Sequence, residues 1–201
     1  MGLKDKRVAQ GESTRVALLE AARELFGEQG YAATSTEEIV LRAGVTKGAL
    51  YHHFSDKESL FRAVFELVQR EVSDRAVDSF LQPDSWEALV GGCRLWIDAH
   101  LDPGVRQIAL VDARGVLGWD SVRAIETRFS GVALRGALRK AMHAGVIRRL
   151  PPRPLAQMLT GALSEACVFI ADADDPVVAR DEVYGLVVDI LAGLRVETGA
   201  H

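Results

Sequence analysis

The 201-residue sequence has only two cysteines, six prolines and 6% aromatic residues. Cys93 and Cys167 lie far apart in apolar helical segments, so we interpret them as buried core residues in a reducing compartment, with a disulfide or redox role as the alternative. No apolar run approaches the roughly 18 to 20 residues of a membrane span, and the polar N-terminus lacks the apolar stretch of a signal peptide. We therefore expect a cytoplasmic protein without a membrane segment.

An excess of positive charge is also missing. The formal net charge is -4, and residues 1–58 carry eight Lys or Arg against nine Asp or Glu. A protein that coats polyanions through a generally basic surface is therefore excluded. Any contact with nucleic acid has to come from a few well-placed basic residues.

Motifs for catalysis or metal binding are absent from the sequence. There is no Ser or Cys nucleophile motif, no HExxH and no glycine-rich loop with phosphate-binding spacing. His52 and His53 are adjacent and project in different directions from a helix, so they cannot chelate a metal ion together as an i, i+4 pair could. We predict that the protein is not an enzyme, has no cofactor and binds no metal.

Helical periodicity runs through nearly the whole sequence. Apolar residues recur three and four positions apart, and no stretch shows the strict alternation or Asn-Gly turns of strands. With 48% hydrophobic residues the chain can fill a sizeable core. We predict an all-α fold with helices at about 14–30, 36–43, 46–54, 57–80, 84–100, 103–114, 119–144, 154–172 and 176–196.

Two short helices in the N-terminal part are joined by a tight, glycine-containing turn, which is typical of a helix-turn-helix. We expect the left-handed stops of the first two helices at Gly30 and Gly44. The residues that we expect to cap the starts of the first four helices are Thr14, Thr36, Thr46 and Asp56.

The helix of the segment "KGALYHHF" has two different sides. Ala49, Leu50, His53 and Phe54 share one side, from which Leu50 and Phe54 can pack inward. The other side is free to meet a partner and suits a DNA major groove, because lysine meets phosphate or guanine and glycine lets the backbone approach. This outer side carries Lys47, Gly48, Tyr51 and His52. Helix starts at Thr36 and Thr46 add amide donors for phosphates.

The stretch "TRVALLEAARELFGEQGYAATSTEEIVLRAGVTKGALYHHFSDKESLF", residues 14–61, resembles the DNA-binding domain of the TetR family of bacterial transcriptional regulators. The resemblance implies a three-helix DNA-binding domain at 12–58 and a helical ligand-binding and dimerisation domain at 59–201. It implies a semi-buried His53, and it assigns the contacts with operator phosphates, bases and backbone to Thr36, Thr46, Lys47, Gly48, Ala49, Tyr51, His52 and Lys57.

The resemblance further implies a homodimer formed by the last two helices. The segments at about 154–171 and 176–196 are largely apolar all round and contain small residues, which permits close packing across a two-fold axis. Burial within one subunit is the alternative. Two recognition helices of a dimer enter successive major grooves about 34 to 36 Å apart, so we expect a near-palindromic operator.

A small-molecule effector of unknown identity is implied for the C-terminal domain. It could move the fourth helix, which joins the two domains, and so change the separation of the recognition helices. Glu165 interrupts one apolar segment and His100 ends another, so we expect both to be buried with a partner. The partner could be a ligand amine or hydroxyl, or a protein group, such as Arg114 or Arg128 for Glu165. The candidate ligand-binding residues, each of which could instead be ordinary core, are Cys93, Trp96, His100, Trp119, Phe129, Met142, Met158 and Glu165.

We therefore predict a DNA-binding repressor that leaves a palindromic operator when its effector binds. An activator, a corepressor-dependent regulator or an effector-independent regulator would have similar DNA-binding residues. A protein of a different class, an interaction module whose "LYHHF" helix meets a protein, is a further alternative. Affinity that falls steeply with salt would favour DNA, because neutralised phosphates release counterions.

Overall fold

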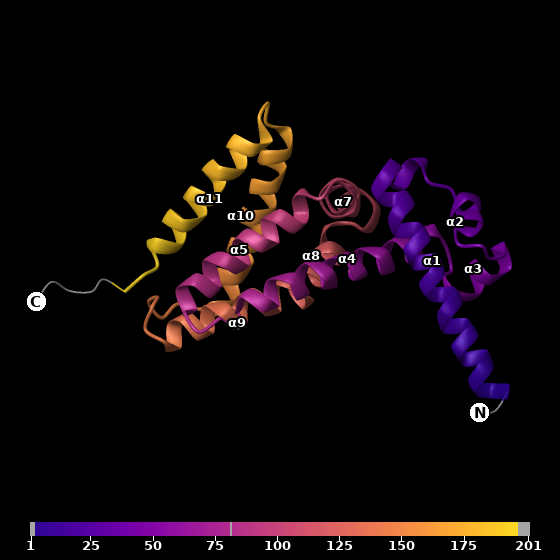
Figure 1. Cartoon of the computed structure of the whole chain (residues 1–201), viewed down its shortest axis with the longest axis horizontal. Coiled ribbons are helices and arrows are strands. Elements are labelled where there is room, and N and C mark those ends of the chain that lie inside the picture. The colour runs from indigo at the N-terminus through magenta and orange to yellow at the C-terminus, as the bar shows by residue number, and fades with distance from the viewer. Residues whose placement is uncertain (1–2, 81, 197–201) are drawn as a thin grey trace, which may run out of the picture. The chain divides into compact units, whose positions relative to one another are not determined.

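The structure of the protein is a computed structural model that describes residues 3–80 and 82–196. Within these ranges the fold is all-α, as the sequence predicted, and no strand occurs beyond an antiparallel bridge between Ile147 and Arg195. The helices, labelled in Figure 1, are α1 Leu3–Ala33, α2 Thr36–Arg42, α3 Lys47–His53, α4 Lys57–Phe80, α5 Ser85–Leu101, α6 Pro103–Arg106, the π-helix η1 Gln107–Asp112, α7 Ala113–Leu117, α8 Trp119–Arg128, α9 Ser130–His143, α10 Pro152–Asp172 and α11 Pro176–Ala192.

The chain forms two compact units. The first, which we call the head unit, combines the residues up to Val68 with Pro103–Val122. The second, the bundle unit, combines Gln69–Asp102 with the residues from Arg123 onward. Helix α4 therefore gives its first half to the head unit and its second half to the bundle unit.

Helix α1 begins earlier than the sequence indicated. The prediction that Thr14 caps its start is wrong, because the helical backbone already begins at Leu3 and the Thr14 hydroxyl donates to the Gln10 carbonyl one turn back. The predicted interruption at Gly30 is confirmed by its positive φ of 79°. The chain bends there before it continues to Ala33.

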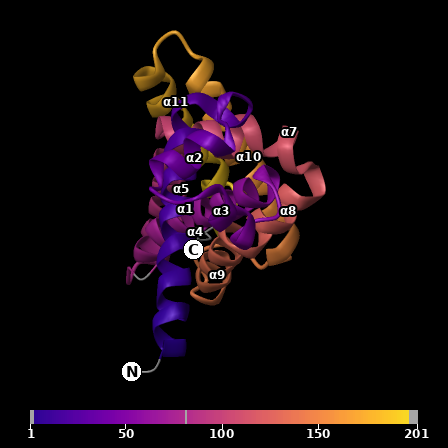
Figure 2. The same ribbon diagram turned by 90° about the vertical axis from the view of Figure 1, so that its right-hand side faces the viewer.

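Local caps set the short helices α2 and α3, which lie beside α1 (Figure 2). Ser35 rather than Thr36 is the N-cap of α2, so the prediction of Thr36 is wrong: the Ser35 hydroxyl accepts from the Glu38 amide, and the Glu38 carboxylate accepts from the Ser35 amide. Thr46 caps α3 as predicted, accepting from the Ala49 amide at 3.2 Å. The cap of α4 is confirmed as well, since the carboxylate of Asp56 accepts from the Ser59 amide.

Aromatic packing holds α1 against the start of α4 in the head unit. Phe61 makes edge contacts with Phe26 and Tyr31, each with ring centroids 5.2 Å apart. Leu50 of α3 and Phe54, which directly follows the helix, are buried, as their side of the helix predicted. The core thus fixes α3 by one side and leaves its other side outward.

The segment 103–117 packs on the C-terminal part of α1. The predicted helix at 103–114 is instead α6, η1 and α7 in succession, ending at Leu117. Its Asp112 carboxylate accepts from the Tyr31 amide at 2.8 Å and from the Gln107 side chain at 3.1 Å. A side chain on Gly27 would meet the Gly104 backbone at 3.0 Å, so the two backbones are in close contact.

Replacing Gly30 by alanine is expected to lower the free energy of unfolding by about 1–3 kcal/mol. Gly30 has φ 79° and ψ 166°, a conformation that is essentially restricted to glycine, and an added Cβ would lie 3.0 Å from Nε2 of Gln107. Chemical denaturation measures the change. Gly136→Ala is the matched control, because Gly136 is helical with open space around it and should be neutral or stabilising. Equal stabilities of the two variants would contradict the prediction.

In the bundle unit, α5 packs against α9, α10 and α11 around a core that includes Leu89, Ile97 and Leu138. Cys93 and Cys167 are both buried free thiols, as the sequence predicted. The single helix predicted at 119–144 is broken at Phe129, whose φ of -101° and ψ of -86° are not helical. The Ser-Gly pair that follows has low helix propensity and could have signalled this break.

The end of α11 also differs from the prediction. The helix stops at Ala192 instead of residue 196, and the following segment pairs with the loop before α10. The Arg148 amide donates to the Leu194 carbonyl at 2.8 Å, and the Val196 amide donates to the Val146 carbonyl at 3.2 Å. This pairing holds the chain after α11 against the start of the α9–α10 connection.

Helix α10 is long and apolar enough to cross a membrane by length and composition, which the sequence analysis did not anticipate. One such helix is weak evidence for a membrane segment, because helices of protein cores and interfaces pass the same test. Only 28% of its most apolar 18-residue window is buried within the chain. An apolar helix that its own fold leaves this exposed is typical of a subunit interface.

Candidate nucleic-acid interface and cavities

The turn between α2 and α3 is held by backbone hydrogen bonds. Gly44, with φ 66°, donates to the Leu41 carbonyl, and the Val45 amide donates to the Val40 carbonyl at 3.0 Å. Because Leu50 and Ile39 are completely buried, both helices are anchored from one side. The turn therefore presents α3 as a rigid, half-exposed helix.

The outer side of α3 is exposed where the sequence placed it. Lys47, Gly48 and His52 are exposed, and Tyr51 keeps 47% of its surface accessible. Ala49 is half-buried. His53 is half-buried too, and its ring contacts His52 edge-on at 5.2 Å between centroids. A lysine, a glycine and two ring donors thus share one accessible helix face, which we call the α3 outer face.

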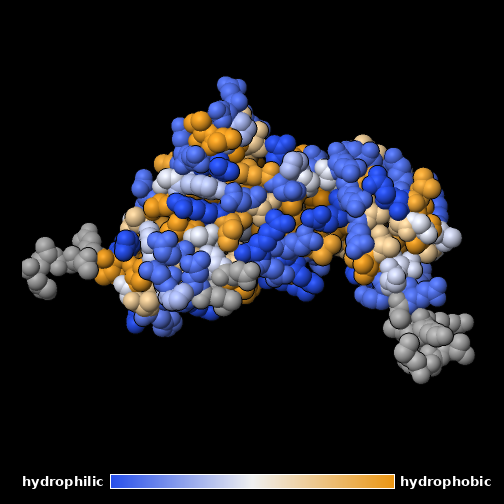
Figure 3. Space-filling model, viewed as in Figure 1, coloured by the Kyte–Doolittle hydropathy of each residue, from blue (hydrophilic) through white to orange (hydrophobic). Residues whose placement is uncertain are grey.

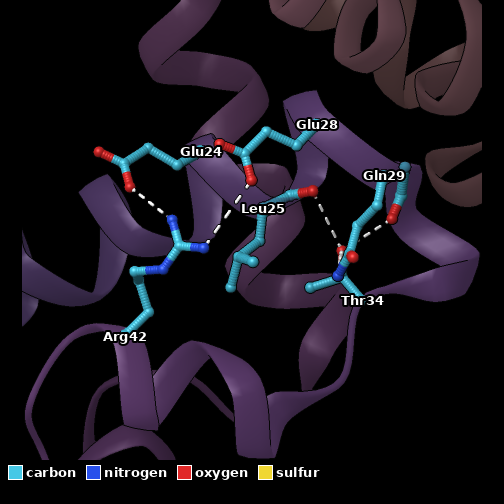
Figure 4. Close-up of polar contacts among 7 residues, drawn as sticks. Glu24, Leu25, Glu28, Gln29, Thr34 and Arg42 are labelled. Atoms are coloured by element: carbon cyan, nitrogen blue, oxygen red, sulfur yellow. Dashed lines mark hydrogen bonds and ion pairs between the residues drawn. The ribbon is translucent and has the colours of Figure 1, made fainter.

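Three carboxylates, one from α2 and two from α1, pair with the nearby cations. Glu37 accepts from the Lys47 ammonium at 2.5 Å, and this hydrogen bond is the main reason why the pKa of Glu37 is lowered and that of Lys47 is raised. Arg42 of α2 lies between two glutamates of α1, at 3.0 Å from Glu24 and 3.8 Å from Glu28 (Figure 4). Both cations are paired within the head unit.

The three remaining residues predicted to contact DNA are already engaged in internal hydrogen bonds. Thr36 is half-buried and its hydroxyl donates to Glu37 at 3.1 Å. Thr46 is exposed and uses its hydroxyl as the helix cap. Lys57 donates to the carbonyls of Tyr31 at 2.7 Å and Thr34 at 2.8 Å, and its ammonium lies 4.0 Å from the Tyr31 ring centroid. Lys57 thereby fixes the end of α1.

Buried Thr34 is a residue that the sequence analysis missed. Its hydroxyl donates to the Gly30 carbonyl at 2.8 Å and lies 3.3 Å from the Leu25 carbonyl, while the Gln29 side chain donates to it (Figure 4). The hydroxyl thereby ties the residues that follow the interruption at Gly30 to the preceding turns of α1. A threonine four residues after a helix-ending glycine was the available signal.

Cys93 lines two cavities of the bundle unit. The first, of about 20 Å³, lies among α4, α5, α9 and α10 and is bordered by Ser73, Ala76, Gly92, Cys93, Trp96, Ser130, Ala133, Leu134, Thr160 and Leu163. The second, of about 110 Å³, lies mainly between α10 and α11. Of the ten described residues around the first cavity, none carries a charge.

Two of the predicted ligand-binding residues, Cys93 and Trp96, line the first cavity. The Trp96 indole donates to the Ser130 hydroxyl at 3.2 Å, and that hydroxyl lies 3.4 Å from the Gln69 side-chain oxygen. Burial raises the pKa of the Cys93 thiol to about 12, so the thiol stays protonated. The cavity wall therefore combines apolar groups with a buried chain of hydrogen bonds from Trp96 through Ser130 to Gln69.

The other predicted ligand-binding residues are not among the residues that line these two cavities. His100 is buried and stacks on Trp96 with ring centroids 3.8 Å apart. Phe129 is half-buried beneath the guanidinium groups of Arg70 and Arg128. Met142 is half-buried as well, and the exposed residues of this set are Trp119, Met158 and Glu165.

The expectation that Glu165 is buried is therefore wrong, while that for His100 is confirmed. Glu165 lies on the exposed side of α10, where water solvates its carboxylate, so the carboxylate does not need a protein partner. The guanidinium of Arg114 stacks on Trp119 at 5.0 Å from the ring centroid, and Arg128 stacks on Phe129. An apolar local sequence alone did not reveal which side of α10 the fold leaves open.

The buried core beneath an exposed short helix defines a helix-turn-helix protein, and comparisons with known proteins specify the family. Two family models match: "Bacterial regulatory proteins, tetR family" over residues 18–64 and "Tetracyclin repressor-like, C-terminal domain" over residues 86–194. The crystal structure of a TetR-family transcriptional regulator from Pectobacterium atrosepticum is 35% identical, with a TM-score of 0.80, and the match covers 94% of this chain and 97% of that one.

Curated relatives agree with this assignment. The transposon Tn10 TetC protein of Escherichia coli is 27% identical over 150 residues, 75% of this chain and 76% of that protein. The transcriptional regulator AcrR of Shigella flexneri is 43% identical over 74 residues, 37% of this chain and 34% of that protein. The chain therefore belongs to the TetR family of bacterial transcriptional regulators.

As a member of this family the protein is a DNA-binding transcriptional regulator and not an enzyme. Regulators of the family bind operator DNA, are usually homodimers and respond to small-molecule effectors. They are typically cytoplasmic. The resemblance in residues 14–61 thus led to the correct family.

Proposed function

We propose that the protein represses transcription by binding a near-palindromic operator as a homodimer and that a small-molecule effector releases it. The observation that carries this proposal is the α3 outer face. Lys47, Tyr51 and His52 are exposed together while buried Leu50 and Phe54 anchor the helix. A rigid helix with outward donors and a side-chain-free Gly48 fits a major groove.

The proposed roles follow from the chemistry of each side chain. Lys47 neutralises phosphate, and Tyr51 and His52 donate to phosphates or base edges. Gly48 and Ala49 let the backbone approach the bases, while Thr36 and Thr46 contribute hydroxyl and amide groups to the backbone contacts. Lys57 acts indirectly, because its ammonium is used by two carbonyls at the end of α1.

Helices α10 and α11 are the proposed dimer interface. Apolar side chains gather over the upper part of α11 in Figure 3. The exposed large apolar residues of the two helices are Met158, Phe169, Val177, Val178, Leu186 and Ile190. A surface of this composition is costly in water and is typical of an interface between subunits. Two-fold pairing would bring two α3 helices to one palindromic site.

We propose that the effector binds in the cavity lined by Cys93 and Trp96 after this cavity has widened. Its present volume of about 20 Å³ is far below the roughly 300–1,000 Å³ of typical ligand sites, so an effector has to open it. Ser73 and Ala76 of α4 belong to its wall. Because the same helix begins in the head unit, opening the cavity offers a route from ligand to recognition helix.

The test is a mobility-shift titration of the purified protein against the DNA immediately upstream of its own gene. We expect a shift that Tyr51→Ala abolishes or weakens strongly, because the variant removes a donor from the α3 outer face. A reporter gene under that promoter should become more active when the regulator is deleted. Falling reporter activity on deletion would indicate an activator instead, and no shift at low salt would contradict the proposed interface.

Replacing Lys47 by alanine is expected to weaken binding to all DNA sequences about equally. The variant should also reduce the slope of log affinity against log salt, by up to about one, because one fewer phosphate is neutralised. Fluorescence anisotropy across a range of NaCl concentrations measures both quantities. An unchanged slope would remove Lys47 from the phosphate contacts.

A further inference from the structure

The Glu37 carboxylate uses its two oxygens for two different residues of the proposed interface. One oxygen accepts from the Lys47 ammonium of α3, and the other accepts from the Thr36 hydroxyl of α2 at 3.1 Å. Both side chains of the ion pair are largely in solvent, with 63% of Glu37 and 55% of Lys47 accessible. The Glu37 carboxylate therefore bridges Lys47 and Thr36, two residues that we propose to contact DNA phosphates.

This arrangement contributes little to folding, because exposed ion pairs have small net stabilities. The α2–α3 unit is held elsewhere, by the Ser35–Glu38 capping box, the Thr46 cap and buried Ile39 and Leu50. Glu37 takes no part in the capping box. Its placement thus calls for a reason other than the stability of the helices.

A carboxylate and a phosphate compete for the same donors. Both offer negative oxygens to an ammonium and a hydroxyl, so Lys47 cannot neutralise a DNA phosphate fully while Glu37 remains bound to it. If Glu37 stays close, it repels that phosphate; if it swings away, its pair with Lys47 is lost. Either course makes binding to DNA less favourable.

We propose that Glu37 occupies, in the free protein, the position of a DNA phosphate oxygen and thereby limits the affinity of the regulator for DNA. The role rests on the proposed DNA interface and adds a residue that works against binding. It keeps Lys47 neutralised until a duplex displaces the carboxylate. Because phosphates are present in every sequence, the restraint acts above all on non-specific binding, which is almost purely electrostatic.

The salt dependence carries the signature of this role. When Lys47 leaves Glu37 for a phosphate, cations are released from the DNA. This release is partly offset because the freed Glu37 carboxylate takes up a cation from solution. Glu37→Gln keeps the shape and the acceptor oxygen but removes the charge. We expect the variant to bind a labelled duplex of unrelated sequence about fivefold more tightly at low salt, with a salt slope steeper by up to about one.

The experiment compares four proteins by fluorescence anisotropy on that duplex: the wild type, Glu37→Gln, Lys47→Ala and the double variant. Lys47→Ala should cost more affinity in the Glu37→Gln background than in the wild type, because only there is Lys47 free of its internal partner. Glu20→Gln, an equal change of charge at an exposed position of α1, is the matched control and should give a smaller gain. Thermal unfolding verifies that all proteins are folded.

Unchanged or weaker binding by Glu37→Gln, with wild-type binding still sensitive to salt, would overturn the role of Glu37 and leave the proposed interface intact. An equal gain in DNA affinity for Glu20→Gln would show that the effect comes from net charge alone, and this result would also overturn the role of Glu37. If the wild type and all variants fail to bind DNA at low salt, both the proposed interface and the role of Glu37 are wrong.

Discussion

Leu186→Glu is expected to give a folded monomer whose operator affinity is reduced by at least about 100-fold. Leu186 lies on α11 with 60% of its surface accessible in the isolated subunit, so a glutamate there does not disturb the subunit's own core. In the proposed dimer the carboxylate would be buried without a partner, which costs several kcal/mol. A monomer presents a single recognition helix and loses the second half-site.

Size-exclusion chromatography with light scattering measures the mass, and a mobility-shift titration measures operator affinity. Val132→Glu is the matched control, because Val132 is 49% accessible and lies on α9, outside the proposed interface. It introduces the same charge and should leave both mass and affinity unchanged. A dimeric Leu186→Glu protein with full affinity would exclude this part of α11 from the interface.

Short-range signals predicted the head unit well. Thr46 and Asp56 cap their helices as expected, and the two sides of α3 have the predicted burial. The sequence also distinguishes Ser35 from Thr36 as the cap of α2, because only Ser35 has a glutamate three residues later to complete a capping box. The information for these features lies within one helical turn, and sequence alone contains it.

Features that depend on distant segments could not be predicted in this way. The hydrogen bond from the Tyr31 amide to Asp112 joins residues 81 positions apart, and nothing near either residue announces it. The pairing of Lys47 with Glu37 likewise requires the angle between α2 and α3. Apolar neighbours suggested burial for both His100 and Glu165, but the packing of α10 decides that only His100 is buried.

The buried His100 has a consequence for stability against pH. Its ring is 1% accessible, stacks on Trp96 and lies 2.9 Å, through Nδ1, from the Trp96 carbonyl. Burial disfavours the charged imidazolium and lowers the pKa of His100 from 6.5 to about 4 in the folded protein. The unfolded chain therefore binds more protons between these two pH values. The stability that the neutral His100 contributes is fully present above about pH 6.5 and is lost as the pH falls toward 4.

Each unit of this pKa difference corresponds to about 1.4 kcal/mol, so acidification from neutral pH to about 4 should remove roughly 3 kcal/mol through His100. The His100→Gln variant retains a donor for the Trp96 carbonyl and does not titrate. Its free energy of unfolding should therefore fall by roughly 3 kcal/mol less than that of the wild type over the same pH range. Chemical denaturation at fixed protein concentration measures the difference, and carboxylates common to both proteins cancel.

His143→Gln separates burial from the mere presence of a histidine. His143 makes the same kind of contact, from Nδ1 to the Arg139 carbonyl four residues back at 2.8 Å, but it is exposed on α9. Its replacement should leave the pH dependence close to that of the wild type. If His100→Gln and His143→Gln show equal losses on acidification, the imidazole of His100 is not held neutral by the fold, and the acid sensitivity of the bundle unit has to come from its carboxylates.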